Sequence, residues 1–272
     1  MTAGLSALVF ALVRATSVGW GSAQTIGVIA GAFMLLVAFV LIERRSATPL
    51  VRSPSFATRN VTVANAAMLA AGAAIIGLFY YLSLYLQRVL GYSAIKAGAS
   101  QLPLAVGIIV AAGLASPLVA RVGIRKVLPA GLALSGGGLV WFAQLQVNGA
   151  YLADVLGPSL LIALGLGMAF VPITILSVTG VQDREYGLAS GLVNTSQQIG
   201  GALGLAVLSS IQTTRTDHLA ASGHPINQAL TLGFDTAFLG AAVFVLLAII
   251  AATAIGTRRV KRDQATPARA TA

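Results

Sequence analysis

Residues Asn60–Gln87 read NVTVANAAMLAAGAAIIGLFYYLSLYLQ, and this stretch contains no aspartate, glutamate, lysine or arginine. A helix needs about 20 predominantly apolar residues to cross the hydrocarbon core of a bilayer. The stretch is therefore long enough for one complete crossing. Its many glycines and alanines also suit close contact between helices, because small residues let two backbones approach each other in a membrane.

Similar uncharged stretches follow one another along almost the whole chain. They are Ala15–Ile42, Ala97–Ala120, Val127–Ala153, Val155–Gln182, Tyr186–Thr214 and Thr236–Thr257. Met1–Val13 is also apolar but is too short to cross a bilayer by itself, so we expect an incomplete first span. The pattern predicts an all-α membrane protein with about eight transmembrane helices.

The composition supports a lipid environment. Hydrophobic residues make up 57% of the chain and charged residues 9%, whereas soluble domains carry roughly 25% charged residues. The polar material is too scarce to cover a soluble core. The net charge of +10 would suit nucleic acid in a soluble protein, but here the basic residues cluster between apolar stretches. We therefore predict a lipid bilayer as partner and no nucleic acid.

The basic residues also predict an orientation. If Met1 lies inside and each stretch crosses once, four basic residues face outward, namely Arg14, Arg88, Lys96 and Arg215. The other 13 of the 17 lysines and arginines then face inward. Basic residues favour the cytoplasmic side of membrane proteins. This excess predicts a multi-pass protein of the plasma membrane with both termini in the cytoplasm, which requires an even number of crossings.

The crossings group into segments of different composition. Residues 1–42 hold two helices, residues 43–59 form a basic cytoplasmic linker, residues 60–256 hold six helices, and residues 257–272 form a basic tail that we expect to be disordered. The six helices divide into two sets of three, Asn60–Gln146 and Leu152–Gly256. Such repeats are a known way to build halves of transporters.

Two long motifs carry a resemblance to a known family. Tyr80–Gly91 reads YYLSLYLQRVLG, and Gly187–Leu205 reads GLASGLVNTSQQIGGALGL. Together with GWG at Gly19–Gly21 and ERR at Glu43–Arg45, they resemble the fourteen-helix drug:proton antiporter branch of the major facilitator superfamily. The resemblance implies two linker helices followed by the C-terminal six-helix bundle. We expect the first linker helix to be clipped and the N-terminal bundle to be missing from this sequence.

The resemblance also implies a function. Members of the family export amphipathic or cationic drugs in exchange for protons, by alternating access between two bundles. We therefore expect drugs, protons and an N-terminal six-helix bundle as partners, and no cofactor. The alternative is a truncated or partner-dependent membrane protein with a structural role and no transport alone. An enzyme is least favoured, because the spans contain no plausible acid, base and nucleophile.

Uncharged polar residues within the spans are the candidates for a substrate cavity, namely Asn65, Gln101, Asn194 and Gln198. The last two share one helical face with Gly187, Gly191 and Gly201, while Gly200 and Gly204 lie on another. The amides either face a central cavity or form hydrogen bonds across a tight helix contact that the glycines permit. Both interpretations remain open on the sequence alone.

A short basic motif begins at the end of the uncharged stretch Ala97–Ala120. Leu118–Lys126 reads LVARVGIRK and resembles the inner-loop motif of the superfamily. Gly123 would permit a tight turn, and Arg121, Arg125 and Lys126 would lie at helix ends, either as part of a gate or as a positive-inside anchor. Ala120 stands where many members have aspartate before the arginine, which weakens any latch that needs this carboxylate.

No acidic residue lies in the middle of a predicted span. Asp154 and Asp235 lie near predicted outer boundaries. Proton coupling needs a protonatable group within the membrane, and we expect the missing bundle to supply it. His218 and His224 fall in a predicted outer loop, Gln212–Phe234, without a carboxylate-rich shell, so we expect no metal site.

Overall fold

A computed structural model describes residues 2–18, 21–45 and 59–253, and every regular element in these ranges is helical. The α-helices are α1 (Thr2–Val18), α2 (Ala23–Arg45), α3 (Arg59–Leu84), α4 (Ala94–Ser100), α5 (Leu102–Val122), α6 (Ile124–Phe142), α7 (Gly157–Val178), α8 (Tyr186–Ala221) and α9 (Ile226–Thr253). Two π-helical turns, η2 (Tyr85–Val89) and η3 (Tyr151–Leu156), and one 3₁₀ turn, η4 (Asp183–Glu185), complete them. The predicted all-α class is confirmed. Most of the predicted basic linker and the whole basic tail lie outside the described residues.

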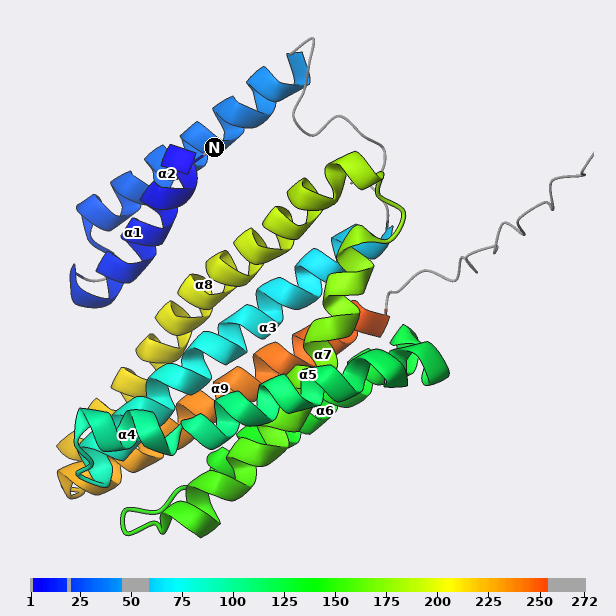
Figure 1. Cartoon of the computed structure of the whole chain (residues 1–272). Coiled ribbons are helices and arrows are strands. Elements are labelled where there is room, and N and C mark those ends of the chain that lie inside the picture. Colours follow the sequence, from blue (N-terminus) through cyan, green and yellow to red (C-terminus); the bar gives the residue numbers. More distant parts are fainter. Residues whose placement is uncertain (1, 19–20, 46–58, 254–272) are drawn as a thin grey trace, which may run out of the picture.

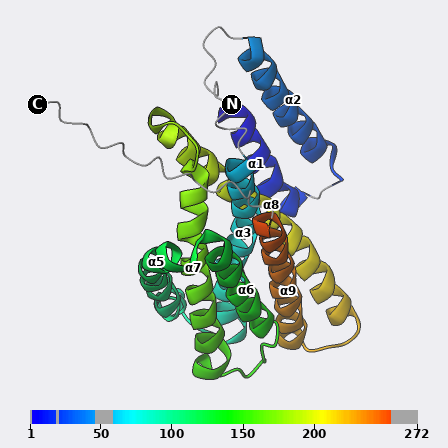
Figure 2. The ribbon, with the colours of Figure 1, turned by 90° about the vertical axis from the view of Figure 1, so that its right-hand side faces the viewer.

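The helices from α3 onward form one bundle (Figure 1). Figure 2 shows α3 between α7 on one side and α8 and α9 on the other. In the same view α5 lies beyond α7, and α6 lies between α7 and α9, both of which it contacts. The hairpin of α1 and α2 stands outside this bundle, and α1 contacts α8. Thus α3 is the central helix, in contact with α7, α8 and α9.

Several of these helices suit a membrane by length and composition. Within the described chain, four stretches are long and apolar enough to cross a bilayer, namely Arg59–Val89, Ala94–Val122, Tyr151–Val178 and Ile226–Thr253. The stretch Ala23–Phe39 is apolar but shorter. The remaining bundle helices, α6 and α8, are more polar. Because α6 and α8 pack against these apolar helices, the bundle is a single unit.

Two predicted boundaries are wrong. The predicted outer loop Gln212–Phe234 is mostly helical, because α8 continues to Ala221 and α9 begins at Ile226. Polar residues end an apolar stretch, but they do not by themselves end a helix. Here α8 ends just before Gly223, which has a φ of 85°, a conformation typical of helix ends. Similarly, α1 continues past Arg14 to Val18. The guanidinium of Arg14 lies 5.6 Å from the centre of the Phe10 ring.

Glycines allow the closest helix contacts. A Cβ atom at Gly200 would overlap the backbone of Leu69 on α3, and one at Gly204 would overlap Ala73. The contact between α5 and α7 has the same character, because a Cβ atom at Gly167 would overlap Ala111. In both cases small residues bring two backbones together.

The two predicted sets of three helices follow one contact scheme. In the first set, α3 packs against α8 and α9 of the second set. In the second set, α7 packs against α5 and α6 of the first. The first helix of each set therefore contacts the second and third helices of the other, which is the relation that two interlocked repeats would have.

Long-range hydrogen bonds fix the bundle end that the sequence predicts to face outward. The Tyr85 hydroxyl donates to the carbonyl of Gln146 at 2.8 Å, and the Tyr151 hydroxyl donates to the carbonyl of Ser100 at 2.7 Å. Both tyrosines begin π-helical turns. The Leu145 amide donates to Oδ1 of Asp235 at 3.2 Å, so Asp235 lies level with the end of α6.

We expect Gly200→Val to destabilise the bundle, because the added atoms would overlap the backbone of Leu69. Overpacking in a well-packed core typically costs about 1–3 kcal/mol. Gly191→Val is the matched control, since a Cβ atom there would meet no other atom within 4 Å. Thermal unfolding of the purified variants in detergent measures the difference. Equal destabilisation by the two variants would contradict this account of the α3–α8 contact.

Candidate functional site

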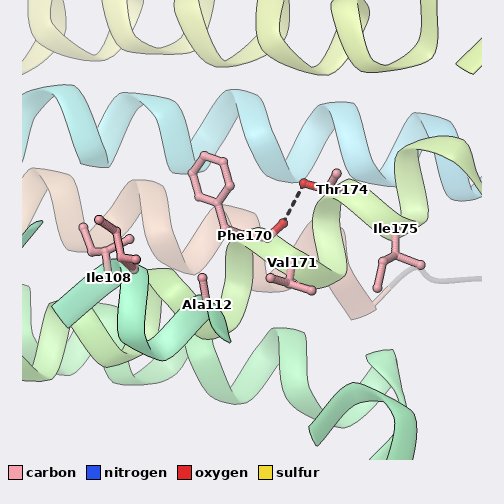
Figure 3. Close-up of a pocket in the computed structure, with 7 residues that line it drawn as sticks. Ile108, Ala112, Phe170, Val171, Thr174 and Ile175 are labelled. Carbon is pink, nitrogen blue, oxygen red and sulfur yellow. Dashed lines mark hydrogen bonds between the residues drawn. The ribbon is translucent and has the colours of Figure 1, made fainter. Parts of the chain in front are cut away.

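An apolar pocket lies between α5 and α7, with a volume of about 430 Å³. Its lining residues come from two helices: Ile108, Ile109 and Ala112 from α5, and Phe170, Val171, Thr174 and Ile175 from α7. Figure 3 shows these side chains together, with the Phe170 ring turned away from the α5 residues and toward α3 (cyan). All of them except Thr174 are hydrocarbon, so this pocket offers an apolar surface.

A second, smaller pocket adjoins the first and has a volume of about 190 Å³. It lies between α3, α7 and α8 and is lined by Met68, Phe170, Thr174, Ser177, Ser190, Val193, Asn194 and Gln197. Phe170 and Thr174 line both pockets. The two pockets therefore share a wall on α7, and together they have an apolar part on α5 and α7 and a more polar part on α8. We call the two together the composite pocket.

The polar side chains of the composite pocket differ in their hydrogen bonds. The Thr174 hydroxyl donates to the Phe170 carbonyl at 2.9 Å, and the Ser177 hydroxyl donates to the Thr174 carbonyl at 2.7 Å. Their protons are thus occupied within α7. By contrast, the side-chain amides of Asn194 and Gln197 bond to no other residue in the described part of the chain. These two amides remain available to a ligand.

The structure separates the four residues predicted for a cavity. Asn194 is exposed and lines the composite pocket, whereas Gln198 is exposed and lines neither part of it. Gln101 lies in the turn between α4 and α5, where its side-chain amide donates to the Ala97 carbonyl at 3.4 Å. Gln101 is seven residues before Ile108 on α5, or roughly 10 Å along a helix.

Asn65 lies in the contact between α3 and α8. Its side-chain nitrogen donates to the Val61 carbonyl at 2.8 Å, and its Oδ1 accepts a hydrogen bond from the Ser196 hydroxyl, also at 2.8 Å. Both polar atoms of this amide are therefore occupied. In this structure Asn65 links two helices, and it does not line the composite pocket.

The glycines of α8 also fall into two groups, one buried in a helix contact and one on an open face. Gly200, Gly201 and Gly204 are buried against α3. Cβ atoms at Gly187 and Gly191 would meet nothing within 4 Å. The helical face that holds Gly187, Gly191 and Asn194 is therefore open among the described residues, and the tight contact lies on the other face.

Phe170, Ser177 and Ser190 line the composite pocket but were not predicted from the sequence. Phe170, Thr174 and Ser177 follow one another at spacings of four and three along α7, and so do Ser190, Asn194 and Gln197 along α8. This spacing places each set on one helical face. The spacing was visible in the sequence, but only the fold shows that these two faces meet.

The inner-loop motif forms a sharp turn. Gly123 connects α5 to α6 with φ of 88°, a conformation that residues with a Cβ atom rarely adopt. Arg121 lies in the last turn of α5, and Arg125 and Lys126 lie in the first turn of α6, and all three are exposed. This arrangement suits either the gate or the anchor, and a gating role stays a prediction.

Comparison with known proteins identifies the family. The family model "Major Facilitator Superfamily" matches residues 1–205. The cephamycin export protein of Amycolatopsis lactamdurans is 38% identical over 90% of this chain and 49% of its own length. The puromycin resistance protein of Streptomyces alboniger is 33% identical over 98% of this chain and 55% of its own length. The lincomycin resistance protein of Streptomyces lincolnensis is 32% identical over 88% of this chain and 48% of its own length. The chain thus spans about half the length of these relatives.

We expect Asn65→Leu and Asn194→Leu to differ in stability. The first variant leaves the half-buried Ser196 hydroxyl without its acceptor, which should cost at most about 1–3 kcal/mol, the penalty for a fully buried polar group. The second variant removes an amide that bonds to no described residue, so the free energy of unfolding should change little. Thermal unfolding of both variants in detergent tests this. An equal loss of stability would show that Asn194 has a structural role.

Proposed function

This chain belongs to the major facilitator superfamily, and we propose that it forms the C-terminal half of a secondary exporter of small molecules. The observation that carries this proposal is the composite pocket, which joins an apolar wall on α5 and α7 to two free amides on α8. Ligand sites are typically apolar with a few placed polar groups. Such a site suits amphipathic drugs held without strict selectivity.

The relatives support export of antibiotics. The matched proteins are named for export of cephamycin and for resistance to puromycin and lincomycin. We propose that this chain acts on the same broad class of molecule, amphipathic or cationic drugs, and that it works by alternating access.

We propose that a second six-helix bundle completes the transport unit. The relatives are about twice as long as the matched region, which leaves room in them for such a bundle. Alternating access requires two bundles that rock around one site. The lining residues of the composite pocket all come from the one bundle of this chain. The second bundle would therefore cover the pocket from the open side.

We also propose protons as the coupling ion, bound mainly by the second bundle. The acidic residues that the structure describes in the six-helix bundle lie toward helix ends or, for Asp235, level with the end of α6. A proton relay needs a protonatable group along the transport path. No lining residue of the composite pocket is ionisable, so the second bundle is the natural source.

We expect drug or dye efflux only when this chain is expressed with a second half, such as the part of the cephamycin export protein that this chain does not match. Within that pair, Asn194→Leu and Phe170→Ala should reduce efflux several-fold, because they remove a free amide and the ring shared by both parts of the pocket. Gln101→Leu is the control, since Gln101 lies outside the pocket.

The assay measures dye efflux from cells with equal amounts of each variant in the membrane. Efflux by this chain alone would contradict the half-transporter proposal. Normal efflux by both pocket variants would contradict the assignment of the site. A pair that assembles but never transports would favour a structural role.

The proposed orientation has its own test. The chain contains no cysteine, so single cysteines can report accessibility. We expect a membrane-impermeant maleimide to label Asn148→Cys, between α6 and η3, in intact cells. Gln182→Cys, between α7 and η4, should react only after the membrane is permeabilised. The opposite pattern would contradict cytoplasmic termini.

A further inference from the structure

We propose that the composite pocket selects uncharged amphipathic molecules over cations, with the apolar body of the ligand against α5 and α7 and a hydrogen-bonding group against Asn194 and Gln197. This inference rests on the proposed function and narrows its substrate class from amphipathic or cationic drugs to neutral amphipathic ones. Three observations support it. The pocket has an apolar part and a polar part, its two amides are free, and no carboxylate lines it.

The two parts of the pocket suit the two ends of an amphipathic molecule. The apolar part, at about 430 Å³, is within the range of roughly 300–1,000 Å³ that drug-sized ligands occupy. Its polar lining group, Thr174, already donates its proton to the Phe170 carbonyl. The smaller part holds the amides and begins directly beyond Phe170 and Thr174. A ligand that spans both parts would place its polar group at α8.

The free amides recognise neutral polar groups. An amide offers both a donor and an acceptor, so Asn194 and Gln197 can each bond to a carbonyl, a hydroxyl or another amide. Their positions at a spacing of three place them on one face of α8. This pair can therefore form hydrogen bonds with an uncharged ligand group that both donates and accepts.

A cation would find no opposite charge on the pocket walls that this chain provides. None of the lining residues is ionisable. The acidic residue nearest to Asn194 in the sequence is Glu185, at the end of η4 just before α8 and nine residues earlier, or roughly 14 Å away along a helix. A charge that leaves water without a partner pays a large desolvation penalty, and dipoles of two amides compensate only part of it. The pocket therefore disfavours a quaternary ammonium relative to a neutral group of the same shape.

The test uses two naphthalene fluorophores that differ only in one group, an uncharged carboxamide or a quaternary ammonium. Their binding to the whole chain in lipid nanodiscs is measured, with empty nanodiscs as the baseline. We expect the carboxamide probe to bind at least about tenfold more tightly than the ammonium probe, a ratio that corresponds to ~1.4 kcal/mol. Phe170→Ala should weaken the binding of both probes, which would locate them in the pocket.

Asn194→Asp is the decisive variant, because it places a carboxylate in the pocket with almost no change of shape. We expect it to raise the affinity for the ammonium probe and to reverse the preference. Gln101→Glu is the matched control, since it makes the same amide-to-carboxylate change outside the pocket and should leave the preference unchanged.

The outcomes separate this inference from the proposed function. If both probes bind equally to the unaltered chain, and Asn194→Asp changes nothing while Phe170→Ala weakens both, the selectivity is wrong and the drug site stands. If Gln101→Glu reverses the preference as strongly as Asn194→Asp, the pocket does not set the selectivity. If neither probe binds above the baseline, the drug site itself is wrong and the selectivity falls with it.

Discussion

The close approach of α8 to α3 determines how the rest of the bundle is arranged. In lipid, apolar side chains gain nothing from leaving their solvent, so helices associate through packing and hydrogen bonds. Gly200 and Gly204 provide that packing, since neither leaves room for a Cβ atom against α3. The Ser196–Asn65 hydrogen bond adds a polar link across the same contact. With this face of α8 fixed, the face that carries Asn194 opens beside α7.

A second close contact forms the other wall of the composite pocket. Gly107 of α5 lies against Ala163 of α7, and Gly167 of α7 lies against Ala111 of α5. Both of these close contacts join α5 to α7, and they therefore position the helix that lines both parts of the pocket. Phe170 and Thr174 lie where the two parts meet, because α7 passes between α5 and α8.

The sequence predicted the fold class because repeated uncharged stretches of bilayer length are typical of helices that cross a membrane. It misjudged Gln212–Phe234, since polar residues were read as a loop and the chain turns only near Gly223. It also grouped Asn65 with Asn194, because both are uncharged polar residues in apolar helices. Only the partners of each amide distinguish them: Asn65 bonds to Val61 and Ser196. Such partners depend on which helix faces meet, and helical spacing alone does not determine that.

The remaining polar groups show which face of the bundle meets something other than lipid. Some hydroxyls within the spans, such as those of Ser135 and Thr174, donate to carbonyls of their own helix and so need no outside partner. The amides of Asn194 and Gln197 have no such internal partner among the described residues, and hydrocarbon offers them none. Water, a ligand or another protein must therefore meet them. The open face of α8 is accordingly a face for solvent, a ligand or another protein, and the composite pocket lies on that face.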